Sequence, residues 1–231
     1  MLKRNAPSQV SSKRVKTKAS KTTKQISRYA PKPKASIGLG FPQMTRATLK
    51  YASSLFATAV APASNRFYRC NGLFDPDQTS TGHQPMYFDN LMNLYNHWVV
   101  IGSRFKFTVH ASTANTNPLY FTLAINDDTT STSTSVEGVV ENTSSSGFKV
   151  IPPGNVNAHT QTLSWSTYNA FGQSPLANAN LRGSSSADPA EQQYFQVIIG
   201  PTDGVTSVTY YGFVEIEYDA IFFELKDLAV N

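Results

Sequence analysis

The sequence has almost no cysteine and no long hydrophobic run. Cys70 is the only cysteine among 231 residues, which excludes a disulfide-stapled secreted scaffold and favours a reducing compartment. The charged first ten residues are not followed by an apolar run, so the start does not have the form of a secretory signal. The most apolar early stretch, residues 55–61, is too short to span a bilayer. These absences predict an unsecreted, soluble protein with no membrane partner.

Charged residues are also scarce, at 15% of the chain, whereas aromatic residues make up 12%. This composition favours β-sheets with large apolar inner faces over helices covered by Glu and Lys. Residues 41–231, called the body below, amount to about 190 residues, a length that suits one all-β domain with its own core.

Acidic residues are absent from the first 50 positions, which hold 13 Lys or Arg. Residues 51–231 hold the other 7 basic residues and all 15 acidic ones, so the two segments have net charges of +13 and −8. Residues 1–40, called the arm, have few apolar residues and no regular apolar period, which predicts disorder in the free chain. A polyanion, bound through counterion release, is the expected partner. The predicted nucleic-acid-binding residues are Lys3, Arg4, Lys13, Arg14, Lys16, Lys18, Lys21, Lys24, Arg28, Lys32 and Lys34.

Three interpretations of the arm are open. It is a nucleic-acid-binding tail, an organelle transit peptide, or a solubilising or nuclear-import segment with no further role. The transit peptide is favoured by serine and the lack of acidic residues, but 8 Lys against 3 Arg and no amphipathic stripe oppose it. The cluster Lys13, Arg14, Lys16 and Lys18 is a candidate nuclear-import signal, which is compatible with nucleic-acid binding.

The body alternates apolar and polar residues with a period of two, the pattern of strands with one buried face. In the last strand, Val214, Ile216 and Tyr218 face one way, while Glu215 and Glu217 face the other. About eight strands with little helix predict a sandwich, a barrel or a jelly roll. The clearest strands are residues 104–109, 119–125, 195–199 and 214–222, and the weaker ones are 46–59, 66–73, 147–151 and 161–168.

One short helix is predicted at residues 89–96, with Asp89 as N-cap and with Leu91, Leu94 and Tyr95 on the inner side. Two long segments, residues 127–147 and 170–192, are rich in Ser, Thr, Ala and Asn. Loops of this length are usually functional surfaces or mobile segments.

The central motif NGLFDPDQTSTGHQPMYFD at residues 71–89 precedes LYNHW at 94–98 and GSRFKF at 102–107. This pattern resembles the capsid proteins of CRESS-DNA viruses, the circovirus-like viruses with circular single-stranded DNA. The match is close over residues 66–110, and the basic start and long last strand agree in kind. The arm is richer in Lys than the Arg-dense arms of circoviruses. The resemblance implies an eight-stranded jelly-roll shell domain at residues 41–231, with the arm inside the shell.

The function expected from this resemblance is that of a coat protein. About 60 copies would form the smallest icosahedral shell, and the arm would package single-stranded DNA without enzymatic activity or a cofactor. The expected location is the virion, with the host nucleus during assembly, and host import machinery and a receptor as partners. The alternatives are the coat protein of a small RNA virus, a cellular nucleic-acid-binding β-protein and an organelle-imported β-protein.

Six residues of the body are candidate inner-surface contacts to nucleic acid. Arg66, Arg69, Arg104 and Lys106 would extend the basic surface, and Tyr68 or Trp98 would stack on bases. In the alternative reading, these residues solvate a strand or pack the core. The central motif itself has turn chemistry, and His83 with Gln84 offers hydrogen bonds to a loop backbone.

The sequence contains no phosphate-binding loop, no G-x-S-x-G elbow and no H-E-x-x-H motif. One cysteine and four scattered histidines do not form a zinc-binding pattern. Carboxylates that meet across a subunit interface would be weak candidates for a Ca²⁺ site, although turn-forming Asp is the default interpretation. The weak candidates are Asp75, Asp77, Asp127 and Asp128.

Overall fold

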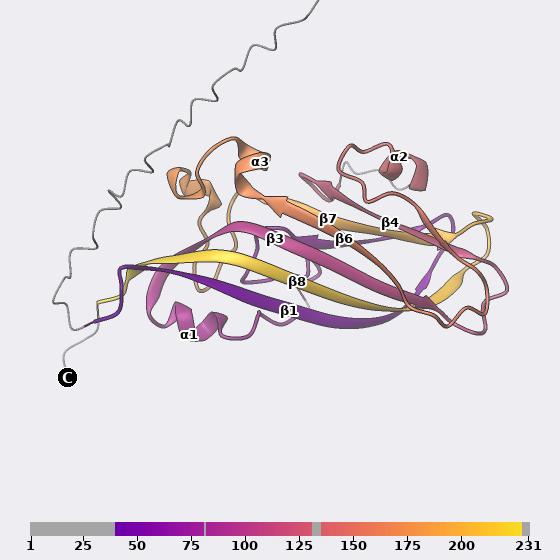
Figure 1. Cartoon of the computed structure of the whole chain (residues 1–231), viewed down its shortest axis with the longest axis horizontal. Coiled ribbons are helices and arrows are strands. Elements are labelled where there is room, and N and C mark those ends of the chain that lie inside the picture. Colours follow the sequence, from indigo (N-terminus) through magenta and orange to yellow (C-terminus); the bar gives the residue numbers. More distant parts are fainter. Residues whose placement is uncertain (1–39, 81, 131–134, 228–231) are drawn as a thin grey trace, which may run out of the picture. The chain divides into compact units, whose positions relative to one another are not determined.

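Two antiparallel four-stranded sheets are built by residues 40–80, 82–130 and 135–227, the parts of the chain that the computed structural model describes (Figure 1). One sheet has the strand order β1-β8-β3-β6 and the other β2-β7-β4-β5. This order, with the first strand beside the last and each sheet drawing strands from both halves of the chain, is that of a jelly roll. The predicted fold is therefore confirmed. The strands are β1 (Met44–Ala59), β2 (Ser64–Arg69), β3 (Tyr95–Ala111), β4 (Leu119–Asn126), β5 (Lys149–Ile151), β6 (His159–Ser166), β7 (Tyr194–Pro201) and β8 (Val208–Leu225).

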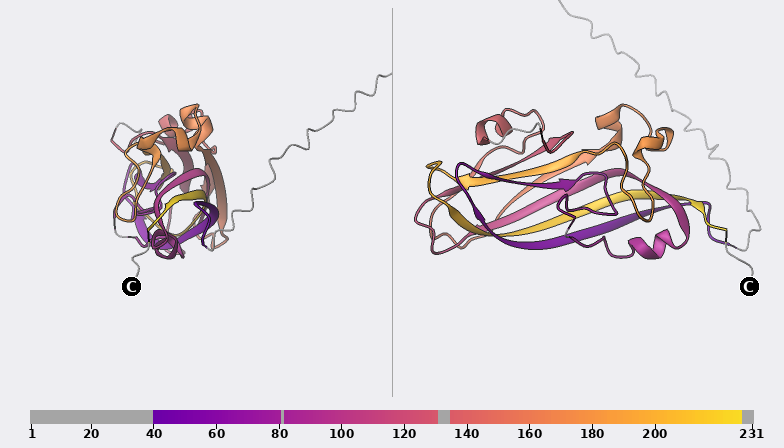
Figure 2. Two further views of the ribbon diagram at one scale, coloured as in Figure 1. Left: turned by 90° about the vertical axis from the view of Figure 1, so that its left-hand side faces the viewer. Right: turned by 180° about the vertical axis from the view of Figure 1, so that it is seen from behind.

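The core lies between the two sheets, which Figure 2 shows as two stacked layers. The alternation predicted for β8 is confirmed, because Val214, Ile216 and Tyr218 are all buried. Aromatic rings join the layers: the Phe105 and Phe195 centroids are 4.9 Å apart in a stacked pair. Such aromatic pairs add to the stability that comes from burying their area.

Three one-turn α-helices and two 3-10 helices lie among the described residues, so the prediction of a single short helix was wrong. They are α1 (Phe88–Met92), α2 (Val136–Val140), α3 (Thr167–Phe171), η1 (Pro175–Ala177) and η2 (Ala179–Leu181). Serine side chains cap two of them: Ser135 accepts from the Gly138 N–H and Ser166 from the Asn169 N–H. None of these described helices is long and apolar enough to cross a membrane.

Helix α1 also differs from its prediction in length and cap. Tyr87, with φ 71°, occupies the N-cap position, and Asp89 lies within the first turn. Phe88 and Met92 are the buried residues of the helix, and Tyr95 already belongs to β3. Only Asn93 and Leu94 separate the end of the helix from the start of β3.

The predicted long loop at 127–147 is anchored to β4 at its end by serine hydroxyl groups. Ser144 Oγ accepts from the Ile125 N–H at 2.9 Å, and Ser146 Oγ accepts from the Leu123 N–H at 3.1 Å. These hydroxyls replace the backbone partners that a neighbouring strand would supply. Within the same segment, Val139 of α2 packs with Ile198 on the outer side of β4 and β7.

The arm lies outside the described residues, apart from Gly40. The predicted nucleic-acid-binding residues at positions 3–34 and the candidate import cluster at 13–18 therefore stay predictions.

Candidate nucleic-acid interface

The outward side of the sheet β1-β8-β3-β6, which we call the charged face, carries basic side chains on β1 and β3 and acidic side chains on β8 between them. Strands β1, β8 and β3 supply its residues, because the period-two alternation turns every second side chain away from the core. The cations are Arg46, Lys50, Arg104 and Lys106, and the acidic residues are Glu215, Glu217 and Asp219.

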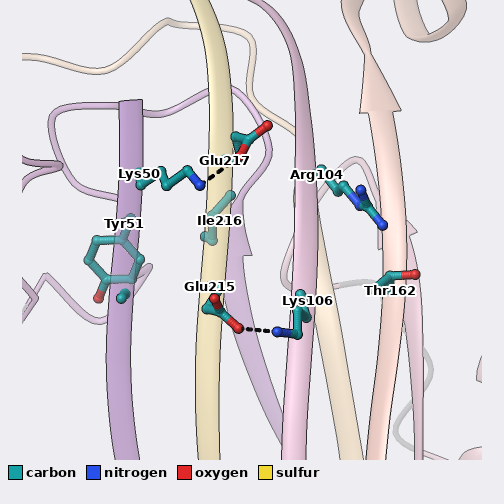
Figure 3. A pocket seen from close by; sticks show the side chains of 9 residues that line it. Lys50, Tyr51, Arg104, Lys106, Thr162, Glu215, Ile216 and Glu217 are labelled. Carbon is teal, nitrogen blue, oxygen red and sulfur yellow. Dashed lines mark ion pairs between the residues drawn. The ribbon is translucent and has the colours of Figure 1, made fainter. Parts of the chain in front are cut away.

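Strand register places cations of β1 and β3 on either side of the acidic residues of β8. Glu217 pairs in register with Lys50 on one side and with Arg104 on the other. Lys50 Nζ lies 3.2 Å from Glu217 Oε2, and Lys106 Nζ lies 2.6 Å from Glu215 Oε2 (Figure 3). A shallow groove of about 400 Å³ runs between these side chains.

The ion pairs on the charged face are exposed and contribute little to stability, about 0–1 kcal/mol each. These ion pairs fix the positions of two cations, because the carboxylates hold the Lys50 and Lys106 amino groups over the sheet. Arg104 is exposed and has no carboxylate at ion-pair distance among the described residues. Figure 3 shows its guanidinium directed over the groove toward β6. The face therefore offers one unpaired guanidinium and two amino groups to a phosphate.

Two of the six candidate contacts, Tyr68 and Trp98, lie in the core and have no ring face free for a base. Tyr68 is 2% exposed, and burial raises the pKa of its hydroxyl well above the usual range. Trp98 is fully buried, and its Nε1–H donates to the Ser184 carbonyl at 2.9 Å. The prediction that these rings stack on nucleic acid was therefore wrong for the folded chain.

Trp98 is enclosed by a close approach of residues 175–184, called the strap. The Trp98 N–H donates to the Gly183 carbonyl at 3.1 Å, and the Gly183 N–H donates back at 2.9 Å. A Cβ atom at Gly183 would lie 2.1 Å from Cζ2 of Trp98. Only glycine therefore allows the strap to pair with β3 over the indole ring.

Gly183→Ala is expected to lower the free energy of unfolding by about 1–3 kcal/mol, because the added methyl group must displace the indole ring or the strap. Urea denaturation followed by tryptophan fluorescence measures the change. Gly40→Ala is the matched control, because a Cβ there meets nothing within 4 Å. Equal stability of the two variants would show that the strap moves freely.

Arg66 and Arg69 lie on β2, in the other sheet, so the four predicted cations do not form one surface. Burial raises the pKa of the Tyr210 hydroxyl, and the nearby Arg66 acts in the opposite direction. The Arg69 side chain is only 14% exposed and is used within the fold. Of the predicted basic contacts in the body, Arg104 and Lys106 alone share a face.

Arg69 is the centre of the turn formed by the central motif. Its Nη1 lies 3.3 Å from Asp75 Oδ2 and also donates to the Asp75 carbonyl, and its Nε lies 3.5 Å from Asp188 Oδ2. Nε also donates to Gln192 Oε1 at 2.8 Å. A Cβ atom at Gly72 would lie 2.6 Å from Arg69 Cδ, so glycine permits this close packing. The motif therefore supports the fold of the chain structurally.

His83 connects the second half of the motif to the edge of β1. Its Nε2 lies 3.0 Å from the Ala52 carbonyl, and its Nδ1 lies 2.8 Å from the Gln84 carbonyl. The ring centroid lies 4.9 Å from that of Tyr51. The prediction that His83 bonds to the loop backbone is confirmed.

The weak metal candidates have other partners or separate positions. Asp75 pairs with Arg69, and Asp77 Oδ1 accepts from the Thr79 N–H at 3.0 Å and from its hydroxyl. Asp127 and Asp128 line a different depression, of about 260 Å³. Within residues 40–80, 82–130 and 135–227, no cluster of three or more His, Cys, Asp or Glu suits a metal ion. A site shared between subunits stays a prediction.

Sequence reasoning missed four aromatic rings on the same side as the charged face. Phe56, Tyr211 and His110 lie in one row across β1, β8 and β3, and Phe213 lies in the next row toward Glu215. The sequence could have predicted the two rings on β8, because Tyr211 and Phe213 alternate in the same phase as Glu215 and Glu217 and therefore lie on the same side of the strand.

No family model matches the chain, and no curated protein sequence matches it significantly. Among solved structures, the chain is similar to that of cocksfoot mottle virus, with 9% identity and a TM-score of 0.45 over 79% of this chain and 97% of that one. The empty head of turnip yellow mosaic virus gives 8% identity and a TM-score of 0.43 over 83% and 87%. Desmodium yellow mottle tymovirus gives 14% and 0.40 over 84% and 95%. The jelly-roll assignment rests on the strand order and not on these low scores.

Proposed function

We propose that this chain is the coat protein of a small icosahedral virus, with the body as the shell domain and the arm as the genome-binding segment. One observation carries the proposal: residues 1–50 hold no acidic residue, have charge +13 and extend from the arm into β1 of a jelly roll, whereas residues 51–231 have charge −8. Jelly rolls also occur in lectins and cupins, so the fold alone does not decide function. The separation of charge along the chain favours a shell that encloses a polyanion.

The number of positive charges that the arms would bring together agrees with this role. About 60 copies in the smallest closed icosahedral shell would bring on the order of 660 positive charges from residues 3–34 to the interior. Flexible lysines contact phosphates and not base edges, so packaging by the arm is expected to be largely independent of sequence. The same property makes the arm equally suited to DNA and RNA.

The proposal also specifies the genome, which is DNA or RNA. Single-stranded DNA is favoured by the resemblance of residues 71–107 to CRESS-DNA virus capsid proteins, and nuclear assembly through residues 13–18 would follow from it. The motif residues around Arg69 have structural partners, so they supply no direct contact that distinguishes DNA from RNA. The solved chains named above come from RNA viruses, but their low similarity decides nothing about the cargo. RNA is therefore the second candidate.

Electron microscopy of the full chain expressed alone, beside a variant lacking residues 2–40, tests the proposal. We expect uniform particles from the full chain and loss of nuclease-resistant cargo in the variant, because the cations of the arm replace the counterions condensed on the genome and release them to solution. Digestion of the extracted cargo by DNase or RNase identifies its type. Monomers or small oligomers at every salt and protein concentration would contradict the coat-protein function.

A charge variant controls for effects of the deletion on assembly. Replacing Lys16, Lys18, Lys21 and Lys24 by Gln should reduce the log–log salt slope of binding to single strands by about 3, from an upper bound of about 8 for eleven cations. The same four positions changed to Arg keep the charge and should keep the slope. A slope that is unchanged in the Gln variant would show that the arm is not the binding segment.

A further inference from the structure

The aromatic rings beside the charged face form an open platform on the sheet β1-β8-β3-β6. Phe56 is 65% exposed, Tyr211 44% and Phe213 43%. The centroids of Phe56 and Tyr211 are 4.7 Å apart, and those of His110 and Tyr211 are 4.9 Å apart with nearly parallel planes. We call Phe56, His110, Tyr211 and Phe213 the aromatic platform.

The opposite end of the same sheet face is covered by the protein itself. Leu176 and Leu181 of the strap pack there against Val99, Ile221 and Phe223. The described residues provide no such cover over Phe56, Tyr211 and Phe213, although Phe56 and Phe213 are as apolar as the side chains that are covered. Three exposed aromatic rings next to one another suggest a binding surface, because exposed apolar side chains are normally scattered singly.

The rows next to the platform contain the cations. Phe213 pairs in register with Thr108 of β3, and the next outward pair along the strands is Glu215 with Lys106, followed by Glu217 with Arg104. Single-stranded nucleic acids bind to surfaces of this composition, where bases stack on aromatic rings and cations follow the phosphates. A four-stranded sheet with aromatic side chains on its central strands is also the arrangement that RRM domains use to bind single strands.

We propose that the aromatic platform is a second binding site for single-stranded nucleic acid. Bases stack on Phe56, Tyr211 and Phe213, and the phosphates run along the groove past Lys106 and Arg104. Arg104 supplies a charge that forms no ion pair with any carboxylate of the described residues, while Glu215 and Glu217 limit the total affinity of the face. This inference rests on the proposed function and adds to it a site in the body, separate from the arm.

Strand β1 connects the arm to the platform. It begins at Met44, opposite Phe223 at the covered end of the sheet, and reaches the platform twelve residues later at Phe56, about 40 Å away. A nucleic-acid strand bound by the arm is therefore tethered to the same molecule as the platform, which raises its effective concentration there if the strand is long enough to span the sheet. Stacking tolerates every base, so the platform is expected to have little sequence preference.

The alternative occupant is a second copy of the chain. Stable protein–protein interfaces bury at least about 1,000 Å² and have cores from which charged residues are depleted. Here the aromatic rings lie beside five charged side chains that also point outward, and an interface over this face would bury them. These are Lys50, Arg104, Lys106, Glu215 and Glu217. This composition favours a polyanion with stacked bases over a self-association surface.

The test uses the full chain with Tyr211 and Phe213 both changed to Ser, and Phe148→Ser as matched control. Phe148 is 49% exposed and lies on the other sheet's side, where its ring centroid is 5.7 Å from that of Tyr120. The probes are oligo-dT and oligo-U of about 20 nucleotides, each with a photoreactive 5-bromo base. Binding is measured at about 0.5 M salt, where the electrostatic contribution of the arm is screened.

We expect crosslinks to Phe56, Tyr211 or Phe213, and a loss of affinity of about 10- to 100-fold per stacked ring in the double variant. The Phe148→Ser control should bind like the unchanged chain. Crosslinks confined to residues 1–40, with affinity unchanged in the double variant, would overturn the inference but leave the coat-protein function intact if particles still form. Loss of particles with unchanged oligonucleotide binding would instead show that the platform contacts a second copy.

Discussion

Replacing Arg69 with Met is expected to lower the free energy of unfolding by about 3–5 kcal/mol at neutral pH. The variant would leave the Asp75 and Asp188 carboxylates without their shared cation in a site where the Asp188 side chain is only 6% exposed. It would also remove the donor to Gln192 and to the Asp75 carbonyl. The hydrophobic side chain of Met fills part of the volume but pairs with none of these groups.

Urea denaturation of the full chain at about pH 7.5 measures this loss. Lys50→Met is the matched control, because it removes a cation from an exposed ion pair with Glu217 and should cost less than about 1 kcal/mol. The double variant Arg69→Met, Asp188→Asn should be less destabilised than the sum of the single variants, because the uncompensated charge is gone. If Arg69→Met costs no more than Lys50→Met, the central motif is held by its packing and not by Arg69.

Much of the fold was predictable from the alternation within single strands. Residues 214–222 showed a strict period of two, and the buried and exposed positions follow it. The strand order was not predictable in this way, since β1 pairs with β8 and joins Met44 to Phe223 across the whole chain. Periodicity describes one strand at a time and does not choose its neighbour. The jelly roll was expected because of the resemblance to capsid proteins, and the topology confirms it.

The short helices and the anchored loop depend on contacts that propensity does not capture. Helices α2 and α3 have five residues each and begin at capping serines, so they offer no apolar period to detect. The Ser-rich composition of residues 127–147 predicts a loop, whereas Ser144 and Ser146 near its end accept hydrogen bonds from backbone N–H groups of β4. The same hydroxyl group bonds equally well to water or to a backbone amide, so composition does not distinguish the two.

The misplacement of Trp98 has a local cause. A β-bulge between Val100 and Gly102 shifts the phase of β3, so that Trp98 points inward before it and Phe105 points inward after it. Without the bulge, a strict period of two from Arg104 would place Trp98 on the charged face. The sequence does not show the bulge, so it predicts the wrong face for Trp98. No such irregularity separates Phe213 from Glu215, so the aromatic platform was predictable from the phase of β8.

Asp188 makes the body less stable as the pH rises, whereas most carboxylates in folded proteins make a protein less stable as the pH falls. Burial raises its pKa from the ordinary 3.8 to about 6, while Arg69 and the Phe74 N–H act in the opposite direction. The folded state therefore holds this proton more tightly than the unfolded chain does. Its contribution to stability is present below about pH 4 and is lost as the pH rises through about 6.

The expected loss is about 3 kcal/mol, since each unit of pKa difference corresponds to about 1.36 kcal/mol. Asp188→Asn resembles the protonated side chain and keeps an acceptor for the Phe74 N–H. Its stability relative to the unchanged chain should therefore rise by about 3 kcal/mol between about pH 4 and about pH 7.5, as measured by urea denaturation.

Asp203→Asn is the control for this pH series. Hydrogen bonds from Thr206 lower the pKa of the exposed Asp203 carboxyl, so its contribution to stability is lost only as the pH falls below its ordinary pKa of 3.8. The difference between Asp203→Asn and the unchanged chain should stay flat over the range in which Asp188 titrates. If the unchanged chain instead gains on Asp188→Asn as the pH rises, Arg69 keeps Asp188 ionised, and the ion pair outweighs the burial that separates this carboxylate from water.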